Sequence, residues 1–143
     1  MSPSPLSRQV QIHKAIGHPA RLRILAMLRQ GELCVCQITT VLQLAPSTVS
    51  AHLAELRGAG LVEERKSGRW VLYRLTPAAE PALTRASEAG LDLDTQIVED
   101  SNLLRRLVEL PVEQICRPDF SVTTLLEAAR RACCQPAALE EKA

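Results

Sequence analysis

Apolar residues recur at a spacing of three or four over the first sixty positions, which is the period of an α-helix. Glycine and proline interrupt this pattern. Gly17 ends the first apolar stripe, and Pro19 suits the first turn of the helix that follows. Only a short break, ending at Pro46, separates the third stripe from the fourth, so these two predict a helix, a tight turn and a helix. The expected helices span about 7–16, 19–30, 34–42 and 46–57.

A β-hairpin is expected after the fourth helix. Residues 61–65 and 69–75 contain the β-branched and aromatic side chains typical of strands, and Lys66-Ser67-Gly68 supplies a turn. Helical patterns return at about 77–89, 91–110 and 121–134. The predicted fold class is mainly α, with a helix-turn-helix, a small β-hairpin and extra C-terminal helices.

The outer face of the helix expected at 46–57 is small and hydroxylated. Ser47, Ala51 and Ala54 lie opposite its apolar positions, and no acidic residue precedes Glu55. Such a face can enter a groove of DNA, where hydroxyls contact bases or phosphates, alanine meets a thymine methyl, and the helix N-terminus favours a phosphate. The alternative is an exposed helix that happens to be small, although such helices usually carry Glu, Lys and Gln.

Basic residues gather at the tip of the expected hairpin. Residues 1–75 hold ten Lys or Arg against four Glu, whereas 76–143 hold seven against twelve acids. A basic tip beside a groove-reading helix fits a wing that straddles the phosphate backbone, and a solvated turn is the alternative. The candidate DNA contacts are Pro46, Ser47, Thr48, Ser50, Ala51, His52, Arg57, Arg65, Lys66 and Arg69.

Composition narrows the class of protein. The 143 residues, 46% of them hydrophobic, fit one domain with a single core. The N-terminus lacks the apolar core of a signal peptide, and no run approaches the ~18 apolar residues of a spanning helix. We therefore expect a cytoplasmic protein without membrane contact. No Ser/His/Asp relay, catalytic carboxylate pair or phosphate-binding glycine loop is visible in the sequence, so an enzyme is not expected.

Two of the five cysteines, Cys34 and Cys36, are separated by a single residue. In a reducing compartment an odd number of cysteines favours ligand or sensor chemistry over a disulfide framework. On a helix Cys34 would join the apolar face of Ile38, whereas Cys36 would point away from it. Cys34 alone is compatible with an ordinary core, but Cys36 has no place on that face. Two buried structural thiols remain the alternative.

Four ordered segments carry a resemblance to a known family. They are KAIGHPARLRIL at 14–25, GELCVCQI at 31–38, PSTVSAHLAELRGAGLV at 46–62 and RKSGRWVLYRL at 65–75. Together they resemble the ArsR/SmtB family of winged-helix, metal-responsive repressors, and most of all its arsenic-sensing branch. The resemblance covers about residues 8–77.

This resemblance implies a homodimer that represses an operator on double-stranded DNA when ligand-free and leaves it when a metal or metalloid binds. It implies that residues 8–90 form a winged helix-turn-helix domain for DNA binding and dimerisation. Residues 91–143 are then a C-terminal helical extension with a cysteine-containing tail.

The resemblance also implies roles for the cysteines. In the arsenic-sensing branch the cysteines of the corresponding segment bind trivalent arsenic or antimony, and Cys34 and Cys36 match their positions. Thiolates suit a soft, thiophilic centre, and thiols near a helix N-terminus ionise more readily. Because positions i and i+2 diverge on a regular helix, one ion would hold both sulfurs only if the first turn were distorted. No cofactor is required, and As(III) or Sb(III) is the expected inducer of a metalloid-resistance operon.

The third sulfur ligand is the open question. The branch commonly has a third cysteine three residues after the second, where this chain has Thr39. The remaining candidates are Cys116 and the vicinal pair Cys133-Cys134, and a site with only two thiolates is also possible. Cys116 alone is more typical of a packed thiol, so the C-terminal pair is slightly preferred, and that pair could equally form a second site.

Two other functions stay open. A repressor of the same fold that responds to cadmium, zinc or thiol oxidation is the nearer alternative. His13, His18 and His52 lack the spacing of zinc ligands, so a nitrogen-rich zinc site is disfavoured. A small thiol oxidoreductase or arsenate-reducing catalyst is the least favoured, because such enzymes place their thiols after a strand in a βαβ unit and none is readable here.

Overall fold

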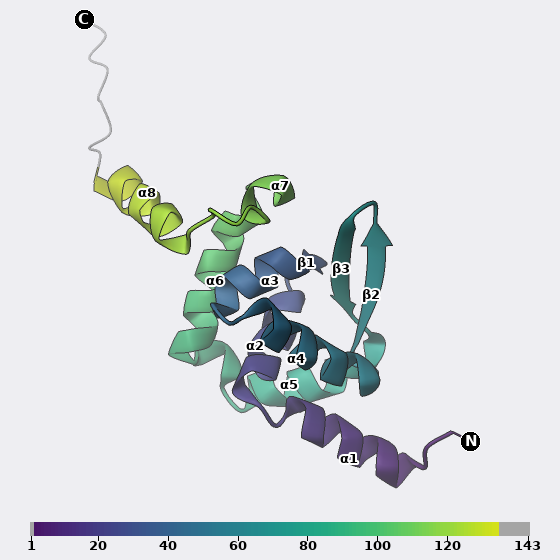
Figure 1. The fold of residues 1–143 in the computed structure, drawn as a ribbon. Helices are drawn as coiled ribbons and strands as arrows, with labels where there is room; N and C mark the ends of the chain where they lie inside the picture. Colours follow the sequence, from purple (N-terminus) through teal and green to yellow (C-terminus); the bar gives the residue numbers. More distant parts are fainter. Residues whose placement is uncertain (1, 135–143) are drawn as a thin grey trace, which may run out of the picture.

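The computed structural model describes residues 2–134. The chain is mainly helical, with one small antiparallel sheet beside the helices (Figure 1). The first half contains α1 (Pro5–Ile16), α2 (Pro19–Leu28), β1 (Leu33–Cys34), α3 (Val35–Leu42), α4 (Pro46–Gly58), β2 (Val62–Ser67) and β3 (Trp70–Leu75). The second half contains η1 (Pro77–Ala79), α5 (Glu80–Glu88), η2 (Leu91–Leu93), α6 (Thr95–Leu107), α7 (Val112–Ile115) and α8 (Val122–Cys134). The predicted winged helix-turn-helix with extra C-terminal helices is confirmed.

Proline and polar caps set where the early helices begin. Ser4 caps α1, since its Oγ accepts a hydrogen bond from the Ser7 amide at 3.1 Å. Pro5 then occupies the first turn, so α1 starts slightly earlier than its apolar stripe predicts. His18 caps α2 in the same way, with its Nδ1 accepting from the Ala20 amide at 3.1 Å. Pro19 and Pro46 lie in the first turns of α2 and α4, as predicted.

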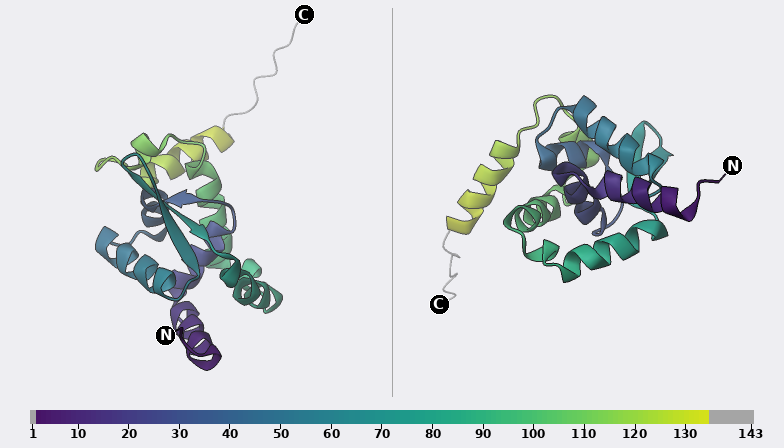
Figure 2. Two further views of the ribbon diagram at one scale, coloured as in Figure 1. Left: turned by 90° about the vertical axis from the view of Figure 1, so that its right-hand side faces the viewer. Right: turned by 90° about the horizontal axis from the view of Figure 1, so that it is seen from below.

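The core lies between α2, α3 and α4 and extends to α6. Ile24, Ile38, Val49 and Leu56, which come from α2, α3 and α4, are completely buried. Leu104 and Leu107 of α6 belong to the same cluster, and so does Ile115 of α7. α6 packs against α2 and α3, and α7 packs against α3. Residues 91–115 therefore share the core of the winged unit, whereas α8 lies on the outer side of α6 (Figures 1 and 2).

A buried ion pair fixes α6 on α2. Arg23 donates to both carboxylate oxygens of Asp100, at 2.7 and 2.9 Å, and Gln96 donates to Asp100 Oδ1 at 2.9 Å. Asp100 is almost fully buried. The side-chain hydrogen bond that Arg23 donates to Asp100 raises the pKa of Arg23 above its ordinary value. This arrangement satisfies a charge that would otherwise be costly to bury.

The sheet has the order β1-β3-β2. β2 and β3 pair in a register that joins Lys66 to Val71 and Ser67 to Trp70. The turn is therefore formed by Gly68 and Arg69, so the predicted turn at 66–68 was wrong by one or two residues. Gly68 adopts a positive φ of 58°, which only glycine tolerates easily. The two-residue strand β1 was not predicted, and neither was α7.

α1 extends away from the body of the molecule, as both figures of the whole chain show (Figures 1 and 2). Only Ala15 of this helix is buried, while Leu6 is 76% exposed and Val10 is 44% exposed. The N-terminal part of its apolar stripe is thus uncovered in the single chain, while Ile12 and Ile16 pack partly against the core. Among the described residues no helix combines the length and hydropathy that a membrane span requires.

Candidate metal centre and nucleic acid interface

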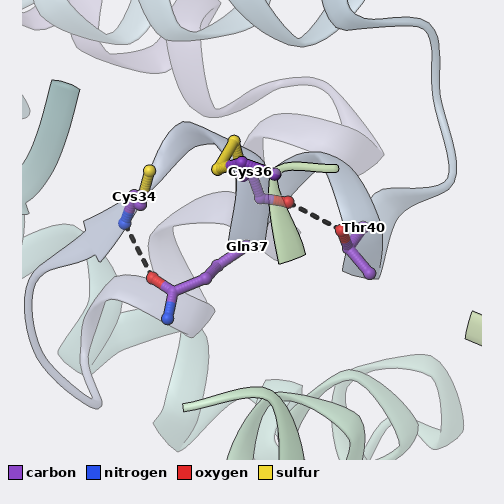
Figure 3. The surroundings of a disulfide bond; sticks show 5 residues. Cys34, Cys36, Gln37 and Thr40 are labelled. Atoms are coloured by element: carbon purple, nitrogen blue, oxygen red, sulfur yellow. Dashed lines mark hydrogen bonds between the residues drawn. A yellow bond between two sulfur atoms is a disulfide. The ribbon is translucent and has the colours of Figure 1, made fainter. Parts of the chain in front are cut away.

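Cys34 lies at the junction between β1 and α3. It ends the strand and is the N-cap of the helix, with an extended backbone at φ −74° and ψ 148°. The side-chain Oε1 of Gln37 accepts a hydrogen bond from the Cys34 amide at 2.8 Å, which fixes this conformation (Figure 3). The Cys34 side chain is only 2% exposed and forms no disulfide.

Cys36 lies in the first turn of α3 and is bonded to Cys116. The disulfide joins residues 80 apart in the sequence, with 5.4 Å between the two Cα atoms. Cys116 follows α7 directly, so the bond ties α7 to α3. The Cys36 carbonyl accepts a hydrogen bond from the Thr40 hydroxyl at 2.7 Å within α3. Both cysteines are half-buried.

The three sulfur atoms of Cys34, Cys36 and Cys116 form one cluster and lie within 4.8 Å of one another. In Figure 3 the Cys34 sulfur is on the same side of the segment as the disulfide. Because Cys34 is extended and precedes the helix, its sulfur approaches that of Cys36 without any change in α3. The expectation that the first helical turn must distort to bring these two sulfurs together was therefore wrong.

Two other expectations about the cysteines are corrected. The chain was expected to keep its thiols reduced, but Cys36 and Cys116 form a disulfide. For the same reason Cys116 is not an ordinary packed thiol. Neither point could be read from the spacing, because α7 brings Cys116 back to α3 only through the tertiary fold. The side chains of Cys133 and Cys134 lie outside the described residues. Thr39 is half-buried on α3.

α4 presents the predicted small face to solvent. Its inner residues Val49, Leu53 and Leu56 are buried. The outer residues Pro46, Ser47, Thr48, Ser50 and Ala51 are all exposed. Since α3 and α4 pack against each other across the short break at 43–45, α4 has the position of the second helix in a helix-turn-helix.

His52 and Arg57, two further candidates on α4, already have protein neighbours. The His52 ring lies 4.5 Å from the His18 ring, centroid to centroid, and its Nδ1 is 3.4 Å from the Arg21 guanidinium. Burial, followed by repulsion from His18 and Arg21, lowers the pKa of His52. Arg57 forms an ion pair with Glu64 of β2 at 2.9 Å. These contacts connect α4 to α2 and to the hairpin.

The tip of the hairpin carries three exposed basic residues, Arg65, Lys66 and Arg69. Arg65 donates to the Glu32 carboxylate, from Nε at 3.2 Å, so the segment before Cys34 holds it. Arg69 lies in the turn, with its guanidinium 4.7 Å from the centre of the Trp70 ring. Within residues 2–134, neither Lys66 nor Arg69 takes part in an ion pair. These two cations are therefore available to an external anion.

Gln37 and Glu32 were not recognised from the sequence. Gln37 had a detectable pattern, because a glutamine three residues after an N-cap is half of a capping box. It was missed because the helix was expected to include Cys34. Glu32 carried no local pattern, since its ion pair with Arg65 exists only because β1 pairs with β3.

The sequence of this chain is similar to those of known bacterial regulators. A model described as "Bacterial regulatory protein, arsR family" matches residues 18–64. The arsenic resistance transcriptional regulator ArsR1 of Pseudomonas putida is 45% identical over 67 residues, or 46% of this chain. The arsenical resistance operon repressor of Escherichia coli is 45% identical over 69 residues, or 48% of this chain. The matches span only 52% and 59% of the lengths of these two relatives.

A third relative is matched over most of its length. The arsenic resistance transcriptional regulator ArsR2 of Pseudomonas putida is 31% identical over 108 residues, which cover 73% of this chain and 94% of that protein. Among solved structures, HlyU from Vibrio cholerae superposes with a TM-score of 0.58 at 32% identity, covering 63% of this chain and 99% of that one.

A second solved structure is the homodimeric winged helix-turn-helix DNA-binding domain of Mb0332 from Mycobacterium bovis. It gives a TM-score of 0.54 at 30% identity and covers 63% of this chain and 87% of that one. The long match to ArsR2 and these superpositions agree with the order of helices and strands described above. This chain belongs to the ArsR family of bacterial regulatory proteins.

Proposed function

We propose that this protein is a transcriptional repressor that binds operator DNA and is released when trivalent arsenic or antimony binds to its cysteine thiolates. The observation that carries this proposal is the cluster of three sulfurs at the start of α3, next to both DNA-contacting elements. The names of the relatives support it, since three of them are arsenic or arsenical resistance regulators. Its site of action is the cytoplasm, and no enzymatic activity is proposed.

DNA contact is assigned to the exposed face of α4 and the tip of the hairpin. Ser47, Ser50 and Ala51 would face base edges, and Lys66 and Arg69 would face phosphates. Pro46 and Thr48 lie at the N-terminus of α4, where the backbone favours a phosphate. Arg65 would reach the DNA phosphate backbone only if its ion pair with Glu32 were broken. His52 and Arg57 would position α4 rather than read bases, because both already contact neighbouring elements.

The position of the cysteines gives two routes from ligand to DNA. α3 leads through residues 43–45 directly into α4. In addition, Cys34 pairs with Leu72 in the sheet, so β1 is hydrogen-bonded to the wing strand β3. A ligand that moves Cys34 or Cys36 would therefore act on the recognition helix and the wing together. Release requires only that the ligand bind more tightly to the conformation that has low DNA affinity.

The chemistry of the donors favours a soft centre. The described cluster contains sulfur alone, and the imidazoles of His18 and His52 face each other instead. In the binding reaction, each cysteine thiol replaces one hydroxide of arsenous acid, forming an As–S bond and releasing one water. Thiolates also bind cadmium and zinc, so a repressor that responds to these ions, or to thiol oxidation, is the alternative.

A homodimer on a pseudo-palindromic operator completes the proposal. One recognition helix reads few bases, and two-fold symmetry doubles the site. The uncovered stripe of α1 supports association with a second copy, and Mb0332 is described as homodimeric. Sedimentation of the full chain at micromolar concentration should give a dimer. A monomer that still protected a single half-site would contradict this.

The test of the proposed function follows operator binding by fluorescence anisotropy on reduced, metal-free protein titrated with arsenite, cadmium or peroxide. Arsenite should release the wild-type chain. Cys34→Ser should still bind the operator but no longer respond, because it removes one soft ligand while keeping a small side chain. Thr39→Ser is the matched control on α3 and should stay inducible. If Cys34→Ser lost operator affinity and stability together, the pair would be structural and the proposal would fail.

A further inference from the structure

We infer that Cys116 is the third thiolate of the metalloid site and that the Cys36–Cys116 disulfide is the closed, non-binding state of the same site. The inference rests on the proposed function and adds its regulation: the protein must be reduced at this bond before it can bind arsenite. It assigns a role to a residue that lies outside the region matched by the family model, residues 18–64.

The first argument is geometric. Two thiolates on one ion, with metal–sulfur bonds of about 2.3 Å, are at most about 4.6 Å apart. The three sulfurs already lie within 4.8 Å of one another. Once the disulfide is broken, small rotations about the Cα–Cβ bonds would let all three face one centre. Cys116 thus supplies the sulfur that Thr39 does not provide.

The second argument concerns access. Cys34 is buried, while Cys36 and Cys116 are half-buried and reach solvent. A small thiol or disulfide can therefore reach the exposed pair, whereas Cys34 stays protected from it. The disulfide involves the two accessible sulfurs and leaves Cys34 as a free thiol.

The third argument is the chemical balance. Formation of the disulfide removes two electrons and two protons from Cys36 and Cys116, and a low-molecular-weight disulfide takes them up and becomes two thiols. Of the three clustered cysteines, only Cys34 can replace a hydroxide of arsenous acid in the oxidised chain. In the reduced chain all three cysteines can do so, forming three As–S bonds and releasing three waters. Oxidation and metalloid binding therefore exclude each other.

The position of Cys116 explains why the site needs the folded chain. Cys116 is held near α3 because α7 docks there through the buried Ile115. Cys34 and Cys36 belong to one short segment, but the third proposed ligand, Cys116, lies 80 residues after Cys36 in the sequence. The metalloid would thus bridge α3 and α7, as the disulfide does.

The experiment uses the full chain in two states, prepared with oxidised or reduced glutathione and then desalted. Peptide mapping of the oxidised chain should find a Cys36–Cys116 link. After incubation with arsenite, the reduced Cys133→Ser/Cys134→Ser variant, which lacks the second candidate site, should retain one arsenic with three sulfur neighbours by X-ray absorption, and the same variant in the oxidised state should retain none. Cys116→Ser should lower the sulfur number to two, while the matched Cys133→Ser/Cys134→Ser variant should keep three.

A second measurement needs no variant. In the reduced wild-type chain, arsenite should protect the accessible Cys36 and Cys116 from alkylation. The inference is overturned if Cys116 remains as reactive as without arsenite, if Cys116→Ser keeps three sulfur neighbours, or if the oxidised chain binds arsenic as well as the reduced one. None of these measurements involves DNA, so they test the inference separately from the proposed function. If arsenic bound to three sulfurs but did not release the operator, only the proposed function would be overturned.

Discussion

Gln37 controls the geometry of the sulfur cluster although it carries no reactive group. Its side chain is buried and accepts the amide of Cys34, which keeps that residue extended at the end of β1. If Cys34 joined the helix instead, its sulfur would diverge from that of Cys36. A single hydrogen bond between neighbours in the sequence therefore favours the approach of two sulfurs whose spacing alone would separate them on a helix.

His52 of α4, whose ring lies against that of His18, makes stability depend on pH. The folded chain lowers the pKa of His52 below the unfolded value of 6.5, mainly through burial and then through His18 and Arg21. The unfolded chain therefore takes up this proton more readily. Stability is fully present above pH 6.5 and is lost as the pH falls from there through the lowered pKa of the folded state.

We predict that His52→Gln reduces the loss of stability between about pH 7.5 and 5, since a neutral amide cannot be protonated there. Urea unfolding at the two pH values measures the change. His13→Gln is the matched control, because His13 is exposed and contacts only the Gln9 carbonyl of its own helix. An equal acid sensitivity in His52→Gln and the wild-type chain would contradict the role assigned to this pair.

At the scale of the elements, β1 is the smallest, but it connects the proposed metalloid site at Cys34 to the proposed DNA-binding wing. Its two residues pair with Tyr73 and Leu72 of β3, and the neighbouring Glu32 holds Arg65 on β2. The longer helices and the hairpin were predictable because their periods and turn residues are local. β1 was not predictable, because two residues are too few to show a periodic pattern. This strand forms only because it pairs with β3 of the wing.

We predict that Arg69→Ala weakens binding to all DNA sequences and lowers the slope of log K against log salt by about one unit per protomer. Arg69 is in the hairpin turn and is free of ion pairs among the described residues, so a phosphate would be its first anionic partner. Arg74→Ala is the control, as Arg74 pairs with Glu63 on the same hairpin. An unchanged slope in Arg69→Ala would remove the wing from the proposed interface.

The contact between α2 and α6 gives a prediction about stability. Asp100→Ala leaves Arg23 partly buried without its carboxylate and should cost about 3 kcal/mol of the free energy of unfolding. Asp92→Ala removes a surface pair with Arg29 and should cost less than about 1 kcal/mol. Denaturant unfolding of both variants tests the difference. Equal effects would mean that the buried pair contributes no more than the exposed one.

At the scale of the whole molecule, the winged helix-turn-helix was predictable from the sequence. The packing of the second half of the chain against α3 was not. The helix-turn-helix, the wing and the CxC segment follow from local pattern and from the family resemblance. The approach of Cys116 depends on α7, a single turn with no periodic pattern, and on one buried residue, Ile115. Long-range contacts of this kind are set by packing, which no spacing along the chain reveals.

The disulfide also changes the covalent topology of the chain. Residues 36–116 become a closed ring that contains both α4 and the wing, while α1, α2 and α8 lie outside it. A cut at the exposed Arg65, Lys66 or Arg69 would open this ring without separating the pieces. We predict that the two products of a tryptic cut at the hairpin stay joined in the oxidised chain on a non-reducing denaturing gel and separate in the reduced chain. Separation of these two products in the oxidised chain would mean that the ring is not closed in solution.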